Sequence, residues 1–322
     1  MLIAILRRIG LSLIILCLVA VLVFLATEVL PGDALDVFLT ADELMTMEPQ
    51  EIEDLRHEFG LDRPAIQRFV EWFSGVIVGD FGTTFIDKTP VSEVIWDPLL
   101  NSLLLAAVIT IIAIPIALII GSLTGYYRGR KADSIISTVA IIGYSIPDFV
   151  IGTLLIMVFA VWIPIFPALI FVFADASVLE LLKVSLMPAI TVIIGHVAHL
   201  SRLLRAGFIE AMNCEFVERA RLSGIPEKRI VFRHALPASV IPSLNSMALF
   251  IGNLLSGLIV IEKVFGYPGL GLQLIEAVDK REVHIVQAVT FLGAVLVIGM
   301  NLLADLSIII LDPRIRSHKH EQ

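Results

Sequence analysis

Six stretches of this chain are long and apolar enough to cross a lipid bilayer, which excludes most soluble folds. They are residues 9–30, 99–125, 134–161, 182–203, 237–261 and 284–311. A spanning helix needs about 20 mostly apolar residues, because the hydrocarbon core is about 30 Å thick. Hydrophobic residues make up 57% of the 322 residues, and the short alternating segments typical of a membrane β-barrel do not account for such runs. The predicted fold is an all-α polytopic membrane protein with six transmembrane helices.

The distribution of Lys and Arg predicts the orientation of these spans. Six spans place both termini on one side, and that side then carries most of the 23 basic residues. Cytoplasmic loops carry the excess of Lys and Arg, so both termini are predicted to be cytoplasmic. The apolar residues 162–174 are interrupted by Pro164 and Pro167. They are predicted to form an outer or partly re-entrant segment, since a seventh span would invert everything downstream.

The first long segment between spans, residues 31–98, is strongly acidic and is predicted to form a helical cap on the outer face. Pro49 to Phe59 has the acids and the following glycine, Gly60, typical of a helix. Pro64 is predicted to open a second helix with an aromatic side. Its aromatic residues are Phe69, Trp72 and Phe73.

No enzyme motif is present. The sequence lacks G-x-x-x-x-G-K-[ST], H-E-x-x-H and G-x-S-x-G, so we expect neither catalysis nor a cofactor. His196 and His199 lie three residues apart and share a helix face. Two histidines are too few for a closed metal site, and a polar contact between helices is the stronger interpretation. Asp305 is expected to pair with a neighbouring cation.

A basic insert separates the fourth and fifth predicted spans at Glu218–Pro237, ERARLSGIPEKRIVFRHALP. Residues 207–222 favour a helix, Gly224 is a stop signal, and Pro226 can open a second short helix. The predicted structure is a compact helix–turn–helix with Arg and Lys suited to an acidic or carbonyl-lined cleft of a partner. A plain positive-inside loop explains the charge but not the Gly–Pro turn.

The order E-x-A-x-x-x-G followed by L-P resembles the cytoplasmic loop of permease subunits in bacterial ABC importers. Arg219 and His234 depart from the family pattern, which commonly has alanine and an apolar residue there. The dipeptide, oligopeptide and nickel branch is the sharper resemblance. Its further motifs occur in order at Arg7–Arg8, Gly60–Pro64, Gly79–Gly82, Ser145–Phe149, Phe265–Gly271 and Leu311–Arg314.

The resemblance implies a type I ABC importer permease in the bacterial inner membrane. Such permeases pair with a second homologous permease, bind one or two ABC ATPases and receive solute from a periplasmic binding protein. The implied organisation is an N-terminal helix with a periplasmic segment (1–97), a five-helix transmembrane domain (98–311) and a cytoplasmic tail (312–322). The residues implied to couple to the ATPases are Glu218, Ala220, Arg221, Gly224, Pro226, Leu236 and Pro237.

Two further groups of residues are candidates for solute handling. Asp148 is a carboxylate deep in the third predicted span, which marks a functional candidate, and Ser145 and Pro147 accompany it on the predicted translocation path. A structural role beside Pro147 is the alternative. The glycine-rich loop 265–271 is a candidate periplasmic gate or receptor contact, with an ordinary tight turn as the alternative. Its named residues are Phe265, Pro268, Gly269 and Gly271.

We therefore expect a permease subunit for peptides, with a nickel or metal-chelate or a glutathione importer as the alternative. A self-sufficient secondary transporter predicts inverted repeats with broken helices, and the sequence shows neither. A membrane scaffold would need no polar residue in its spans, and Asp148 argues against it.

Overall fold

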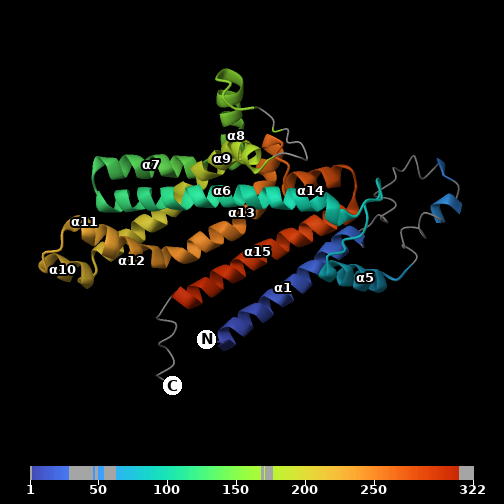
Figure 1. The fold of residues 1–322 in the computed structure, drawn as a ribbon, viewed down its shortest axis with the longest axis horizontal. Helices are drawn as coiled ribbons and strands as arrows, with labels where there is room; N and C mark the ends of the chain where they lie inside the picture. Colours follow the sequence, from blue (N-terminus) through green and yellow to red (C-terminus); the bar gives the residue numbers. More distant parts are fainter. Residues whose placement is uncertain are drawn as a thin grey trace.

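The chain folds into a bundle of long helices in this computed structural model (Figure 1), which describes residues 2–28, 46–47, 50–53, 63–167, 170 and 177–311. The long helices are α1 (Leu2–Glu28), α6 (Val91–Tyr126), α9 (Val178–Met212), α13 (Leu244–Phe265) and α15 (Val283–Leu311). The shorter ones are α5 (Ala65–Val78), α7 (Lys131–Ser145), α8 (Asp148–Ile156), α10 (Glu215–Leu222), α11 (Glu227–Ile230), α12 (Leu236–Val240) and α14 (Leu270–Asp279). Two short π-helices, η1 (Met157–Trp162) and η2 (Val231–Ala235), and the 3₁₀ turn η3 (Ile241–Ser243) complete the order. This confirms the all-α membrane fold.

The packing of α6 against α9 forms the centre of the bundle. Along α6 a buried residue recurs every four positions, so that these residues lie on one helix face. The later ones are small, and a Cβ on Gly121 would lie 2.8 Å from the carbonyl oxygen of Ser201. Small residues allow two membrane helices to approach closely, where packing and not water exclusion drives association. The series is Leu105, Ile109, Ala113, Ala117, Gly121 and Gly125.

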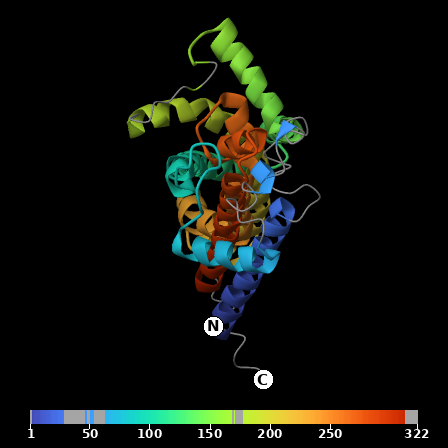
Figure 2. The ribbon, with the colours of Figure 1, turned by 90° about the vertical axis from the view of Figure 1, so that its right-hand side faces the viewer.

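The third predicted span, 134–161, is not a continuous helix. It is divided into α7 and the pair α8–η1, which meet at 96°. Ile146 (φ −92°, ψ 128°) and Pro147 (φ −58°, ψ 139°) are both extended, because the ring of a proline disfavours the helical conformation in the residue before it. Among the residues that the structure describes, five helices are long and apolar enough to cross a membrane, and six if the bent pair counts as one span. The α8–η1 arm rises from the bundle in two views (Figures 1 and 2).

Helices α1 and α15 lie side by side and α5 packs across them. Arg8 forms an ion pair with Asp305, which confirms the predicted partner for that acid. Pro64 precedes α5 as predicted, and its aromatic side packs on the bundle, with ring centroids 5.4 Å apart for Phe24 and Phe69 and 6.0 Å apart for Trp72 and Phe291. The predicted helix 49–59 lies mostly outside the described residues. Only 50–53 are described there, and they are helical.

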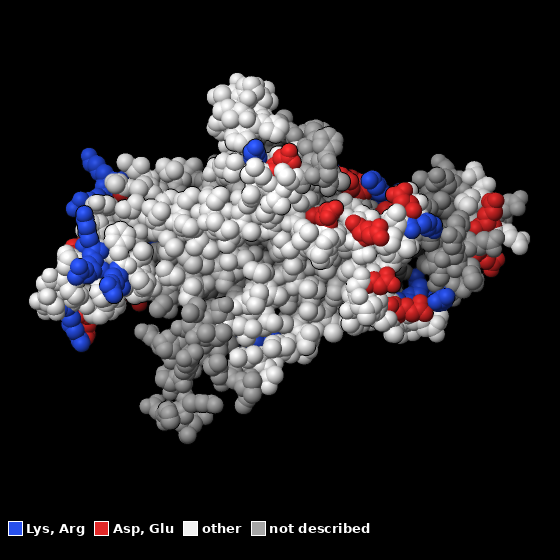
Figure 3. Space-filling view, in the orientation of Figure 1, with Lys and Arg blue, Asp and Glu red and all other residues white. Residues whose placement is uncertain are grey.

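The two ends of the bundle differ in charge. Lys and Arg gather around α10, α11 and the α6–α7 turn, whereas Asp and Glu gather at the opposite end around α5 and α14 (Figure 3). At that acidic end, a turn between α5 and α6 is fixed by the buried Glu282. Its carboxylate accepts hydrogen bonds from the backbone N–H groups of Phe85 (2.7 Å) and Ile86 (2.9 Å).

Candidate coupling knob and translocation groove

The knob, as we call α10, α11 and the following η2, differs in one respect from the prediction. The helix predicted over 207–222 is interrupted, because α9 ends at Met212 and α10 begins at Glu215. The second short helix, α11, follows α10 as predicted. Gly224 between them has φ +73°, the left-handed conformation that glycine adopts without strain, and Pro226 immediately precedes α11. The knob has its own small core against the end of α9. Its buried residues are Phe208, Ala211, Val217, Ala220, Ile230 and Ala235. The knob is therefore an ordered extension of α9.

An ion pair closes the turn of the knob. Arg221 donates to both carboxylate oxygens of Glu227, with the Nη2–Oε1 distance at 2.7 Å. These hydrogen bonds lower the pKa of Glu227 and raise the pKa of Arg221. Of the other predicted coupling residues, Glu218 and Pro237 are exposed and Leu236 is half-buried.

The outer surface of the knob is both apolar and basic. Leu222 is 83% exposed and Phe232 70% exposed, although both are large apolar side chains. Exposed apolar residues ringed by polar ones are typical of a protein contact. The neighbouring exposed cations are Arg219, Lys228, Arg229 and Arg233.

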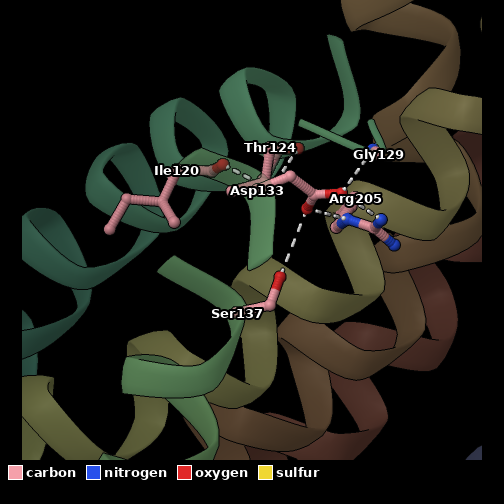
Figure 4. A network of polar contacts seen from close by, with 7 residues as sticks. Ile120, Thr124, Gly129, Asp133, Ser137 and Arg205 are labelled. Atoms are coloured by element: carbon pink, nitrogen blue, oxygen red, sulfur yellow. Dashed lines mark hydrogen bonds and ion pairs between the residues drawn. The ribbon is translucent and has the colours of Figure 1, made fainter. Parts of the chain in front are cut away.

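A polar network ties α7 to α9 shortly before the knob (Figure 4). Asp133, in the first turn of α7, accepts from Arg205 Nε and Nη2 at 2.8 Å each. The N–H of Gly129 and the hydroxyl of Ser137 donate to the same carboxylate, at 3.0 and 3.3 Å. Asp133 is buried, so the pair fixes the α7–α9 spacing at the knob end.

Asp148 faces α9 at the bend between α7 and α8. Its Oδ2 lies 3.7 Å from His196 Nδ1, and a Cβ on Gly195 would lie 2.6 Å from its Oδ1, so the glycine makes room for the carboxylate. One turn further along α9, the ring of His199 stacks on Tyr144 with centroids 5.3 Å apart. These contacts place titratable and aromatic side chains along the line where α7 meets α9, which we call the groove.

The two other residues predicted for the path, Ser145 and Pro147, are both exposed at the bend. Ser145 donates its hydroxyl to the carbonyl of Ile141 at 2.8 Å. His196 also contacts Phe250, with ring centroids 5.2 Å apart. Within the described part of the chain, no group of three or more His, Cys, Asp or Glu is arranged to hold a metal ion.

The glycine-rich loop is an internal joint and not an open surface. Phe265, Gly269 and Gly271 are buried, and Pro268 is half-buried. The loop leads into α14, whose first N–H groups would otherwise lack acceptors. Buried Glu262 accepts from the N–H of Gly271 at 2.6 Å and from that of Leu272 at 3.3 Å.

Helix α6 completes this joint. Ser102 donates its hydroxyl to Glu262 (2.6 Å) and accepts from the N–H of Leu270 (2.8 Å). Tyr267 donates to the carbonyl of Asn101 at 3.0 Å, and burial raises the pKa of Tyr267 to about 12. These bonds lock α6, α13 and α14 together. Sequence reasoning did not single out Glu262, although an acid at the very end of a predicted apolar span was a usable signal.

Comparison with known proteins identifies two matching family profiles. Residues 113–317 match the binding-protein-dependent transport system inner membrane component, and residues 1–106 match the N-terminal membrane component of such systems. The oligopeptide transport system permease protein AppB of Bacillus subtilis is 32% identical over 314 residues, 97% of this chain and 98% of that protein. The glutathione transport system permease protein GsiC of Salmonella typhi is 33% identical over 304 residues, 94% of each chain.

Proposed function

Because the chain belongs to the family of binding-protein-dependent transport system inner membrane components, we propose that it is a permease subunit of an ATP-driven peptide importer. It is a multi-pass inner membrane protein and a transport component, not an enzyme in itself. Similarity to an oligopeptide permease over 97% of the chain supports peptides as cargo. Glutathione, itself a small peptide, is the second candidate, favoured by the similarity to a glutathione permease.

The observation that carries the coupling role is the ordered knob at the end of α9. A separate ABC ATPase would bind its exposed apolar and basic surface, and one or two such subunits would supply the energy. The knob end then faces the cytoplasm, as the positive-inside rule favours, and both termini are proposed to lie on that side of the membrane. The acidic end around α5 and α14 faces outward, where a solute-binding protein delivers cargo. A second homologous permease supplies the other half of the pore.

The mechanism follows from how the knob is attached. Movement of the ATPases would displace the knob, and the small core around Phe208 would pass that movement to α9. The Asp133–Arg205 pair then carries α7 along with α9, so that the groove bearing Asp148 moves as well. This is a rigid-body change of the kind by which packed helices switch between two states.

Reconstitution tests this function. The permease pair, the ATPases and the binding protein are placed in liposomes, and uptake of a labelled tripeptide is followed with and without ATP. We expect uptake only with ATP and ATPases. Gly224→Trp, which forces a bulky residue into the left-handed turn, should leave the ATPases hydrolysing ATP without uptake or release them. Uptake that persists without any ATPase would disprove the proposal.

The orientation has its own test. In a background lacking Cys17 and Cys214, a cysteine at Arg221 should react with an impermeant maleimide only when the cytoplasmic face is exposed. A cysteine at Glu276, in α14, should react only from the outside, and serves as the matched control. The reverse pattern would invert the proposed topology.

A further inference from the structure

A cavity of about 560 Å³ lies between α7 and α9, beside the groove that holds Asp148. Ser134 and Ser137 line it from α7, and His199, Arg202 and Arg205 line it from α9. Arg205 is already neutralised by Asp133. Arg202 is exposed, and it forms no hydrogen bond or ion pair with any residue that the structure describes. The cavity therefore offers an uncompensated guanidinium and a serine hydroxyl.

The chemistry of this lining favours a carboxylate. A guanidinium has a planar fork of donors that matches two carboxylate oxygens, and the hydroxyl of Ser134 can donate to the same group. Asp133 adds no net repulsion, because the guanidinium of Arg205 balances its charge. An anionic group entering the cavity would gain the charge of Arg202 without displacing an existing partner.

Asp148 does not line this cavity but lies further along the line where α7 meets α9, at the bend after α7. It contacts His196, which is six residues before Arg202 on α9, a separation of about 9 Å along the helix axis. His199 stands between them and is held by Tyr144. Measured along α9 from the His196 contact, this acid and the base at Arg202 are separated by about 9 Å, and they suit a molecule with a cation at one end and an anion at the other. An extended peptide of two or three residues spans about 7–11 Å.

We propose that the groove binds a short zwitterionic peptide during passage, with its ammonium group at Asp148 and its carboxylate at Arg202. The inference rests on the proposed function and adds the two residues that select the peptide ends. The carboxylate then lies toward the knob. Gly195 contributes to the site because its missing side chain lets the Asp148 carboxylate pack directly against α9.

The test uses the reconstituted importer and three forms of trialanine: the free peptide, its C-terminal amide and its N-acetyl derivative. Loss of a hydrogen-bonded charge pair changes binding about tenfold. Arg202→Gln should therefore lower the uptake efficiency of free trialanine about tenfold and leave that of the amide unchanged. Asp148→Asn should act likewise on free trialanine and spare the N-acetyl form. The same binding protein is used throughout, so its own selectivity cancels in the ratio of variant to wild type.

Two further variants serve as controls. Arg202→Lys keeps the charge and should retain most of the preference for the free carboxylate. Arg128→Gln makes the same substitution in the α6–α7 turn, outside the cavity, and should change nothing. An equal loss for free and amidated peptide, or no loss for either, would overturn the inference.

Anionic phospholipid is the competing occupant, because basic pockets near the cytoplasmic surface also bind lipid headgroups. The peptide assignment would be overturned by the following result. The purified wild type retains phosphatidylglycerol, Arg202→Gln loses it, and the substitution leaves peptide selectivity unchanged. Failure of the wild type to import any peptide in response to ATP would reject the proposed function itself, and is seen without any variant.

Discussion

The Asp133–Arg205 pair allows a quantitative prediction about what holds α7 to α9. The Asp133 side chain is 7% exposed and that of Arg205 is 29% exposed. Removing the partner of a buried charge costs about 3–5 kcal/mol. Arg205→Met should destabilise the folded protein by about 3 kcal/mol, at the low end of that range, because Gly129 and Ser137 still donate to the carboxylate.

The opposite substitution should cost less. Asp133→Asn leaves a guanidinium that water can still reach, so the expected loss is about 1–2 kcal/mol. The double variant Asp133→Leu/Arg205→Met removes both charges and should be more stable than Arg205→Met alone, since apolar groups can replace a buried ion pair at little cost.

Equilibrium unfolding of the purified permease in mixed micelles, titrated with SDS and followed by circular dichroism, measures these differences. A loss below about 0.5 kcal/mol for Arg205→Met would mean that the pair contributes no more than an exposed surface pair. Additive losses in the double variant would mean that the two residues act independently. Either result would refute the argument.

Three further substitutions have definite expected outcomes. Gly224→Ala places a side chain at positive φ and should cost about 1–2 kcal/mol of knob stability, seen as weaker ATPase binding, whereas Gly257→Ala, with no atom within 4 Å of the new Cβ, should be neutral. Gly271→Ala would drive its Cβ into the backbone of Ile259 and should lower yield and thermal stability, and a normal unfolding temperature would contradict the joint. Glu282→Ala removes the acceptor of two backbone N–H groups and should make the turn after α5 cleavable by added protease, while uptake assays of uncleaved protein stay active.

The sequence predicted the features that depend on local patterns. Apolar length predicted the spans, Pro64 predicted the start of α5, and Gly224 with Pro226 predicted the knob. The predicted partnership of Asp305 also holds, because an acid near the end of an apolar helix needs a cation and Arg8 is available.

The features that sequence reasoning missed join residues far apart in the chain. Glu262 reaches Ser102 across 160 positions, and Arg205 reaches Asp133 across 72. Contacts between residues so far apart in the sequence leave no periodic pattern in it. The bend at Pro147 was hidden for a different reason. The apolar run continues through it, and hydropathy reports the length of a segment but not its direction.

The joint built on Glu262 has a consequence for how this protein can move. Three helices that share one carboxylate and one hydroxyl cannot slide past each other without leaving buried polar groups unpaired. Bending of the helices during a transport cycle must therefore concentrate where no such hydrogen-bonded joint connects the described helices. The elbow at Ile146 and Pro147 is such a place, since it interrupts the helical hydrogen-bond ladder between α7 and α8.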